Sequence, residues 1–81
     1  MTKEIHITPN PVGRGDELII HMQKNGFNRR NLSVYYYTGT EVISDSTHRN
    51  KVKITAPEQP GLYFVVIYDQ DLVKTSTFAV Y

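Results

Sequence analysis

The 81-residue sequence contains no cysteine, which excludes a disulfide framework, a thiolate zinc site, an iron–sulfur cluster and a thiol nucleophile. It also lacks a dominant charge, because nine Lys and Arg stand against eight Asp and Glu for a net charge of +1. A nucleic-acid binder would need a basic stripe to neutralise phosphates, so we expect no nucleic-acid partner. No apolar run is long enough to cross a bilayer, so no membrane insertion is expected.

Side chains that suit a pleated sheet dominate the composition. Val, Ile, Thr, Tyr and Phe supply 32 residues, against two Ala and four Leu. No segment keeps a helical period, whereas alternating apolar residues predict seven short strands at residues 3–8, 17–22, 32–37, 41–44, 51–55, 62–68 and 72–80. The chain is long enough for one small core only. We therefore expect residues 1–81 to form a single all-β domain, an antiparallel sandwich.

Proline and glycine separate the predicted strands. Pro9-Asn10-Pro11 ends the first strand, because proline cannot donate to a ladder and fixes its own φ. Thr38-Gly39 predicts a tight hairpin, since glycine is free to adopt positive φ. Gly61 follows a proline-rich corner, and positive φ there would let Tyr63 drop into the core.

The run at residues 62–68 is apolar at every position, which predicts a central strand buried on both faces. In the last strand Phe78 and Val80 share one face and are expected in the core, with Lys74 among the outward residues. Residues 23–31 and 45–50 are polar and predict loops.

No catalytic or metal-binding arrangement is evident in the sequence. His6, His21 and His48 are the only imidazoles, and no two have the spacing that would place two ligands on one metal, so we expect them to be solvated. Ser44, Asp45 and His48 could form a nucleophile–acid–base set, yet they lie on a predicted polar loop without rigid support. We expect no enzyme, no cofactor and no metal.

Five motifs occur in an order that resembles a known family. They are Pro9-Asn10-Pro11-Val12, the strand Leu18-Ile19-Ile20, Val34-Tyr35 before Thr38-Gly39-Thr40-Glu41-Val42, Pro60-Gly61-Leu62-Tyr63-Phe64-Val65, and a short terminal strand that contains Lys74. From about residue 7 to residue 81 this order resembles the type A C-terminal sorting domain of the type IX secretion system of Bacteroidetes.

The resemblance implies an immunoglobulin-like sandwich of seven strands that acts as a secretion signal. Such domains are recognised by an outer-membrane translocon, and a sortase-like protease usually removes them as the cargo is anchored at the cell surface. A larger parent cargo would carry the signal peptide and pass through the periplasm and outer membrane. The candidate residues for recognition or for the fold are Pro9, Asn10, Pro11, Gly39, Gly61, Tyr63, Lys74, Phe78, Val80 and Tyr81.

Other functional classes stay open. Tyr35-Tyr36-Tyr37 places aromatic rings on both faces of one strand, so the domain could be an adhesion or carbohydrate-binding module of a secreted enzyme. A structural spacer would need no site at all. The terminal strand at residues 72–80 carries Lys74 as its sole charge, so its edge is poorly protected. A receptor could bind that edge by strand addition, and a second copy could pair there or exchange a strand to form a homodimer.

Overall fold

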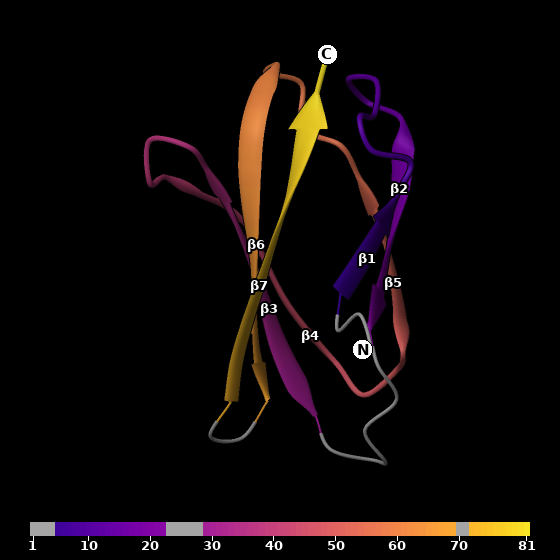
Figure 1. Ribbon diagram of the computed structural model, residues 1–81, viewed down its shortest axis with the longest axis vertical. Helices are drawn as coiled ribbons and strands as arrows, with labels where there is room; N and C mark the ends of the chain where they lie inside the picture. The colour runs from indigo at the N-terminus through magenta and orange to yellow at the C-terminus, as the bar shows by residue number, and fades with distance from the viewer. Residues whose placement is uncertain (1–4, 23–28, 70–71) are drawn as a thin grey trace.

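The chain forms seven strands in a computed structural model that describes residues 5–22, 29–69 and 72–81 (Figure 1). No described residue belongs to a helix, so the prediction of an all-β fold is confirmed. The strands are β1 (Ile5–Thr8), β2 (Glu17–Met22), β3 (Arg30–Tyr36), β4 (Glu41–Thr47), β5 (Lys51–Thr55), β6 (Gly61–Asp69) and β7 (Leu72–Val80).

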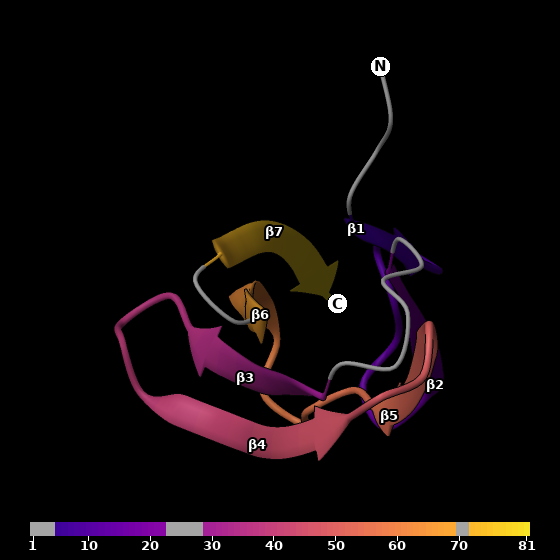
Figure 2. The same ribbon diagram turned by 90° about the horizontal axis from the view of Figure 1, so that it is seen from below.

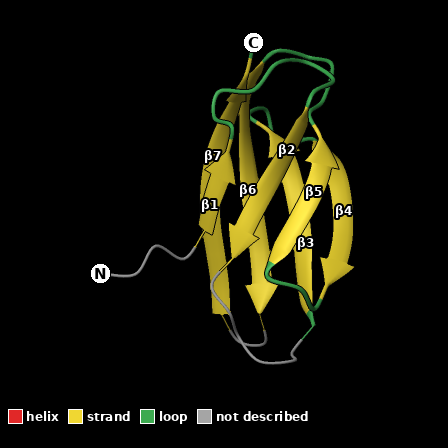
Figure 3. Cartoon of the chain, turned by 90° about the vertical axis from the view of Figure 1, so that its right-hand side faces the viewer, coloured by secondary structure: helices red, strands yellow, loops and turns green. Residues whose placement is uncertain are grey.

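The strands form two antiparallel sheets that pack face to face (Figures 2 and 3). The smaller sheet has the order β1-β2-β5 and the larger the order β4-β3-β6-β7. The pairings of β2 with β5 and of β3 with β6 join strands that are not consecutive, so the chain crosses between the layers. This arrangement has the character of an immunoglobulin-like sandwich.

Alternate residues of each sheet point into the space between the layers, where they form one core. On β6 the inward residues are Tyr63, Val65 and Ile67, and on β2 they include Leu18 and Ile20. The buried apolar set is Ile5, Ile7, Val12, Leu18, Ile20, Met22, Leu32, Val34, Ala56, Tyr63, Val65, Ile67, Phe78 and Val80.

The outer face of β6 differs from the prediction. The strand is central in its sheet, between β3 and β7, but it is buried on one face only. Leu62 is 43% exposed, Phe64 39% and Tyr68 41%. A sandwich of two layers has a single core, so apolar residues on the other side of a central strand remain at the surface. The prediction that residues 62–68 are buried on both faces was therefore wrong.

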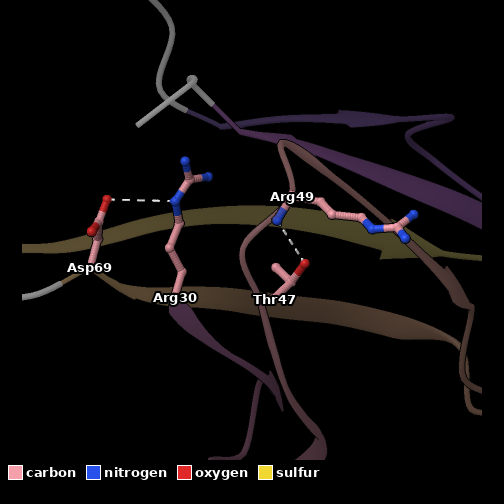
Figure 4. Close-up of polar contacts among 4 residues, drawn as sticks. All are labelled: Arg30, Thr47, Arg49 and Asp69. Atoms are coloured by element: carbon pink, nitrogen blue, oxygen red, sulfur yellow. Dashed lines mark hydrogen bonds and ion pairs between the residues drawn. The ribbon is translucent and has the colours of Figure 1, made fainter. Parts of the chain in front are cut away.

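Two predicted loops are shorter than expected. β4 continues to Thr47, so only residues 48–50 connect it to β5, and the backbone N–H of Arg49 donates to Thr47 Oγ1 at 3.0 Å within this turn (Figure 4). β3 begins at Arg30, within the predicted loop 23–31, of which residues 23–28 lie outside the described residues.

Arg30 and Asp69 form an ion pair that the sequence did not predict (Figure 4). Arg30 Nε lies 3.6 Å from Asp69 Oδ2, and each side chain is only 3% exposed. Arg30 opens β3 and Asp69 ends β6, next to the paired residues Asn31 and Tyr68. The pair therefore joins the start of β3 to the end of β6. Removal of either partner would leave a buried charge and would destabilise the fold.

Replacement of Tyr63 by Ala should lower the free energy of unfolding by about 3–5 kcal/mol, because it removes a buried ring and leaves a cavity. The ring is 1% exposed and stacks on Phe78 with centroids 5.3 Å apart. Phe64→Ala is the matched control, since its ring comes from the outward face of the same strand and should cost about 1 kcal/mol. Urea unfolding measures both, and equal losses would contradict the one-sided burial of β6.

Candidate functional site

Residues 9–14 leave β1, cross to the other sheet and lie along the end of β7. Val12 forms a parallel bridge with Val80, in which the Val12 N–H donates to Ala79 O at 2.9 Å and the Tyr81 N–H donates to Val12 O at 3.0 Å. The Pro9-Asn10-Pro11 segment thus carries the chain from the first strand to the second sheet. Both its Thr8–Pro9 and Asn10–Pro11 peptide bonds are cis.

The Asn10 side chain takes the place of a partner strand. Its Nδ2 donates to Thr77 O at 3.2 Å, and its Oδ1 accepts from the Ala79 N–H at 3.0 Å. A primary amide carries one acceptor and a donor, as a peptide group does, so it can satisfy the backbone at a strand edge. The flanking prolines have no N–H to offer, which makes Asn10 the hydrogen-bonding residue of the motif.

Tyr81 is held by its backbone while its side chain is 67% exposed. Its carbonyl oxygen accepts from both the backbone N–H and the Nε of Arg14, each at 3.2 Å. Arg14 is followed by Gly15 at φ +74°, whose N–H donates to Ala56 O. The end of the described chain is therefore anchored to the 9–14 segment.

Gly61 begins β6 with φ +143°, which side-chain-bearing residues rarely adopt. A Cβ at this position would lie 2.9 Å from Cε1 of Tyr36, so the Tyr36 ring also requires glycine there. The Tyr36 hydroxyl donates to Pro60 O at 3.2 Å and keeps the ring over the corner. The prediction that Gly61 adopts positive φ is confirmed.

Tyr63 connects this corner to the last strand. Its hydroxyl donates to Gln59 O at 2.6 Å, and its ring stacks on Phe78 at an interplanar angle of 11°. Burial raises the pKa of the Tyr63 phenol, and the neighbouring Tyr36 phenol raises it further. Both effects favour the neutral phenol, which is the form that donates to Gln59.

Gly39 and Lys74 lie apart from this cluster. Gly39, at φ +103°, turns the chain from β3 to β4, and its N–H donates to Tyr36 O at 2.8 Å, as the hairpin prediction required. Lys74 lies opposite Ile67 and shares its side of β7 with Phe78 and Val80. Its half-buried side chain therefore does not belong to the outward row, and that part of the prediction was wrong.

The free edge of β7 has a closed half and an open half. In the closed half, the backbone groups that point away from β6 form hydrogen bonds with Asn10, Val12 or Arg14. These groups belong to Thr77, Ala79 and Tyr81. Because strand backbones alternate, Val73 and Thr75 turn their N–H and C=O groups to the same side. No described residue hydrogen-bonds those groups, although β1 lies beside β7 (Figure 3). We call Val73 to Thr75 the open half of the edge.

The outer face of the larger sheet is uncharged over three strands. Its outward positions, given by the register, are Asn31, Ser33, Tyr35, Leu62, Phe64, Val66, Tyr68, Val73, Thr75, Thr77 and Ala79. The corresponding face of the smaller sheet carries His6, Glu17, His21, Lys51 and Lys53. The apolar run at residues 62–68 already indicated an uncharged outer face, because alternate residues of a strand face outward in any two-layer fold.

Among the described residues, no group of three or more His, Cys, Asp or Glu is placed to hold a metal ion. No helix of residues 5–22, 29–69 and 72–81 is long and apolar enough to span a membrane. Two of the three histidines, His6 and His21, are nevertheless cross-strand neighbours, which their sequence spacing did not suggest.

No protein-family model matches the sequence, and no curated protein matches it. The features available for recognition are the open half of the β7 edge and the uncharged outer face beside it.

Replacement of Asn10 by Ala should cost about 1–2 kcal/mol of stability, because two edge hydrogen bonds are lost. The amide proton of Ala79 should exchange faster with solvent, since Asn10 Oδ1 is its acceptor. Asn31→Ala is the matched control, an exposed asparagine on β3 for which no side-chain hydrogen bond is found among the described residues. Hydrogen-exchange NMR measures both variants, and an unchanged Ala79 rate in Asn10→Ala would disprove the edge role.

Proposed function

We propose that this domain is a folded sorting signal of the kind that the type IX secretion system uses, with no catalysis of its own. The proposal rests on the motif resemblance and on one observation, the half-closed edge of β7. Pro9, Asn10 and Pro11 come together with Phe78, Val80 and Tyr81 around the closed half. These motif residues therefore cover the edge of β7 from Thr77 onward, so that the edge from Val73 to Thr75 stays available to a partner.

The open half of the β7 edge suits recognition by strand addition. An incoming strand would hydrogen-bond the outward backbone groups of Val73 and Thr75, and backbone contacts tolerate many side chains. Broad tolerance fits a signal that works on different cargo proteins. The exposed Phe64 and Tyr68 lie on the adjoining face of β6, where they could add apolar contact area. A second copy of the domain could pair at the same edge.

The proposed route follows from this recognition step. The cargo crosses the periplasm with its own signal peptide, and the outer-membrane translocon binds the domain and exports the protein. A sortase-like protease then separates the domain from its cargo at the cell surface. None of these steps requires a cofactor or a reactive side chain of the domain itself.

A fusion of the 81-residue chain to a secreted reporter tests the proposal in a type IX-competent bacterium. Thr75→Pro should abolish surface delivery, because proline removes the outward N–H of the open half and its ring blocks pairing. It should spare the β6–β7 ladder, since the Thr75 backbone groups face away from β6. Thr75→Val keeps the N–H and should be delivered like the unchanged chain.

Delivery of the unchanged fusion must also disappear in a translocon mutant, and melting curves must show that both variants fold. A folded Thr75→Pro variant that is still delivered would show that the open half is not read. Loss of delivery in Phe64→Ser with Tyr68→Ser would then place recognition on the outer face. Delivery of the unchanged fusion without the translocon would disprove the sorting function.

A carbohydrate-binding or adhesion module is the second candidate, and the outer face of the larger sheet favours it. Tyr35, Phe64 and Tyr68 present aromatic rings among Ser, Thr and Asn side chains, and no outward position of β3, β6 or β7 is charged. Aromatic rings that stack on sugars, with hydroxyl and amide groups beside them, suit a neutral glycan.

Affinity electrophoresis through gels that contain neutral polysaccharides tests this candidate. Retardation should be lost in Phe64→Ser with Tyr68→Ser, because the two rings supply the stacking surface. Tyr81→Ser is the control, since its exposed ring lies beside Gly13 and outside the three strands that form the proposed surface. Unretarded migration of the unchanged protein in every gel would count against glycan binding and would leave the sorting proposal unaffected.

A further inference from the structure

His6 and His21 lie directly opposite each other in the β1–β2 pair. Both side chains point away from the core, because Ile5, Ile7, Ile20 and Met22 occupy the inward positions of these strands. The two ring centroids are 5.8 Å apart with an angle of 44° between the planes. His6 is exposed and His21 half-buried, so solvent reaches the space between the rings.

This separation matches that of two imidazoles on one metal ion. A zinc–nitrogen bond is about 2.0–2.1 Å, which puts the centroids of two rings on a tetrahedral ion about 5–6 Å apart. The backbone register of β1 and β2 therefore holds the two rings at a spacing that one shared ion requires.

Thr8 supports the orientation that ligation needs. Its Oγ1 lies 3.1 Å from His21 Nε2. A metal-bound histidine usually donates its other ring N–H to an oxygen, which fixes the tautomer and the ring plane. When Thr8 Oγ1 accepts from the Nε2–H, Nδ1 of His21 is unprotonated and free to bind a cation.

We propose that His6 and His21 bind one divalent transition-metal ion, of which Zn²⁺ is the test case, with water completing the coordination. Imidazole nitrogen is a preferred ligand for zinc, copper and nickel, and calcium or magnesium would prefer oxygen. The site lies on the outer face of the smaller sheet, whereas the sorting proposal concerns β7 of the larger sheet, so the two proposals are tested by separate experiments.

The charges around the pair limit its affinity. Lys51 is paired with His21 across β2 and β5 and projects from the same face. Lys53, one step along, has its ammonium 3.9 Å from a Glu17 carboxylate oxygen, which partly offsets its charge. The Lys51 ammonium repels a cation at the histidines, so removal of that charge should tighten binding.

Calorimetric titration of the untagged protein with zinc chloride tests the site. The unchanged protein should bind one ion per chain, and His6→Gln and His21→Gln should each weaken binding at least about tenfold, because one of two protein ligands is lost. His48→Gln is the matched control: it removes the third imidazole, from the turn between β4 and β5, and should leave the affinity unchanged. Lys51→Gln should raise the affinity severalfold.

NMR of the imidazole protons provides the second measurement, because zinc should shift the signals of His6 and His21 and leave those of His48 in place. Glutamine keeps a polar side chain at these outward positions, and thermal melts confirm that the variants fold. The proposal is overturned by the absence of saturable binding, by equal loss in His48→Gln, or by shifts confined to one ring.

Discussion

The contact between residues 9–14 and β7 is the interaction on which the rest of the structure depends. Among the residues that the structure describes, the two sheets otherwise meet through side chains, whereas here the chain that leaves β1 forms hydrogen bonds with the last strand of the other sheet. These bonds hold β7 in place, and β7 in turn positions Phe78 against Tyr63. Asn10 extends the contact by one more backbone pair, so a short polar side chain helps to close the sandwich.

The local pattern of the sequence was enough to predict most of the fold. Strands β2, β5 and β7 have the predicted bounds, because clear alternation and turn residues delimit them. The pattern could not tell that the outer face of β6 stays exposed, since an apolar run does not report how many layers cover it. The pairing of Arg30 with Asp69 and that of His6 with His21 depend on strand register, which joins residues far apart in sequence and leaves no local signal.

The residues that carry the motif resemblance are mainly structural. Gly61 accommodates the Tyr36 ring, and Tyr63 and Phe78 fill the core, so none of them is available to a partner in the folded domain. The accessible chemistry lies on the two outer faces, one basic with paired histidines and the other aromatic and uncharged over β3, β6 and β7. The two faces therefore differ in the side chains that they present to solvent.

The parallel direction of residues 10–14 and the end of β7 also determines how the domain responds to a pulling force. β1 starts about half-way along the long axis and β7 finishes at one end of it (Figure 1), so tension applied between the start of β1 and the end of β7 loads the Val12–Ala79 and Tyr81–Val12 hydrogen bonds. In this geometry the bonds, together with those of Asn10, are loaded in shear and must break together instead of one after another. Tension between these two segments therefore meets several hydrogen bonds at once, whereas strands that are peeled apart release them singly.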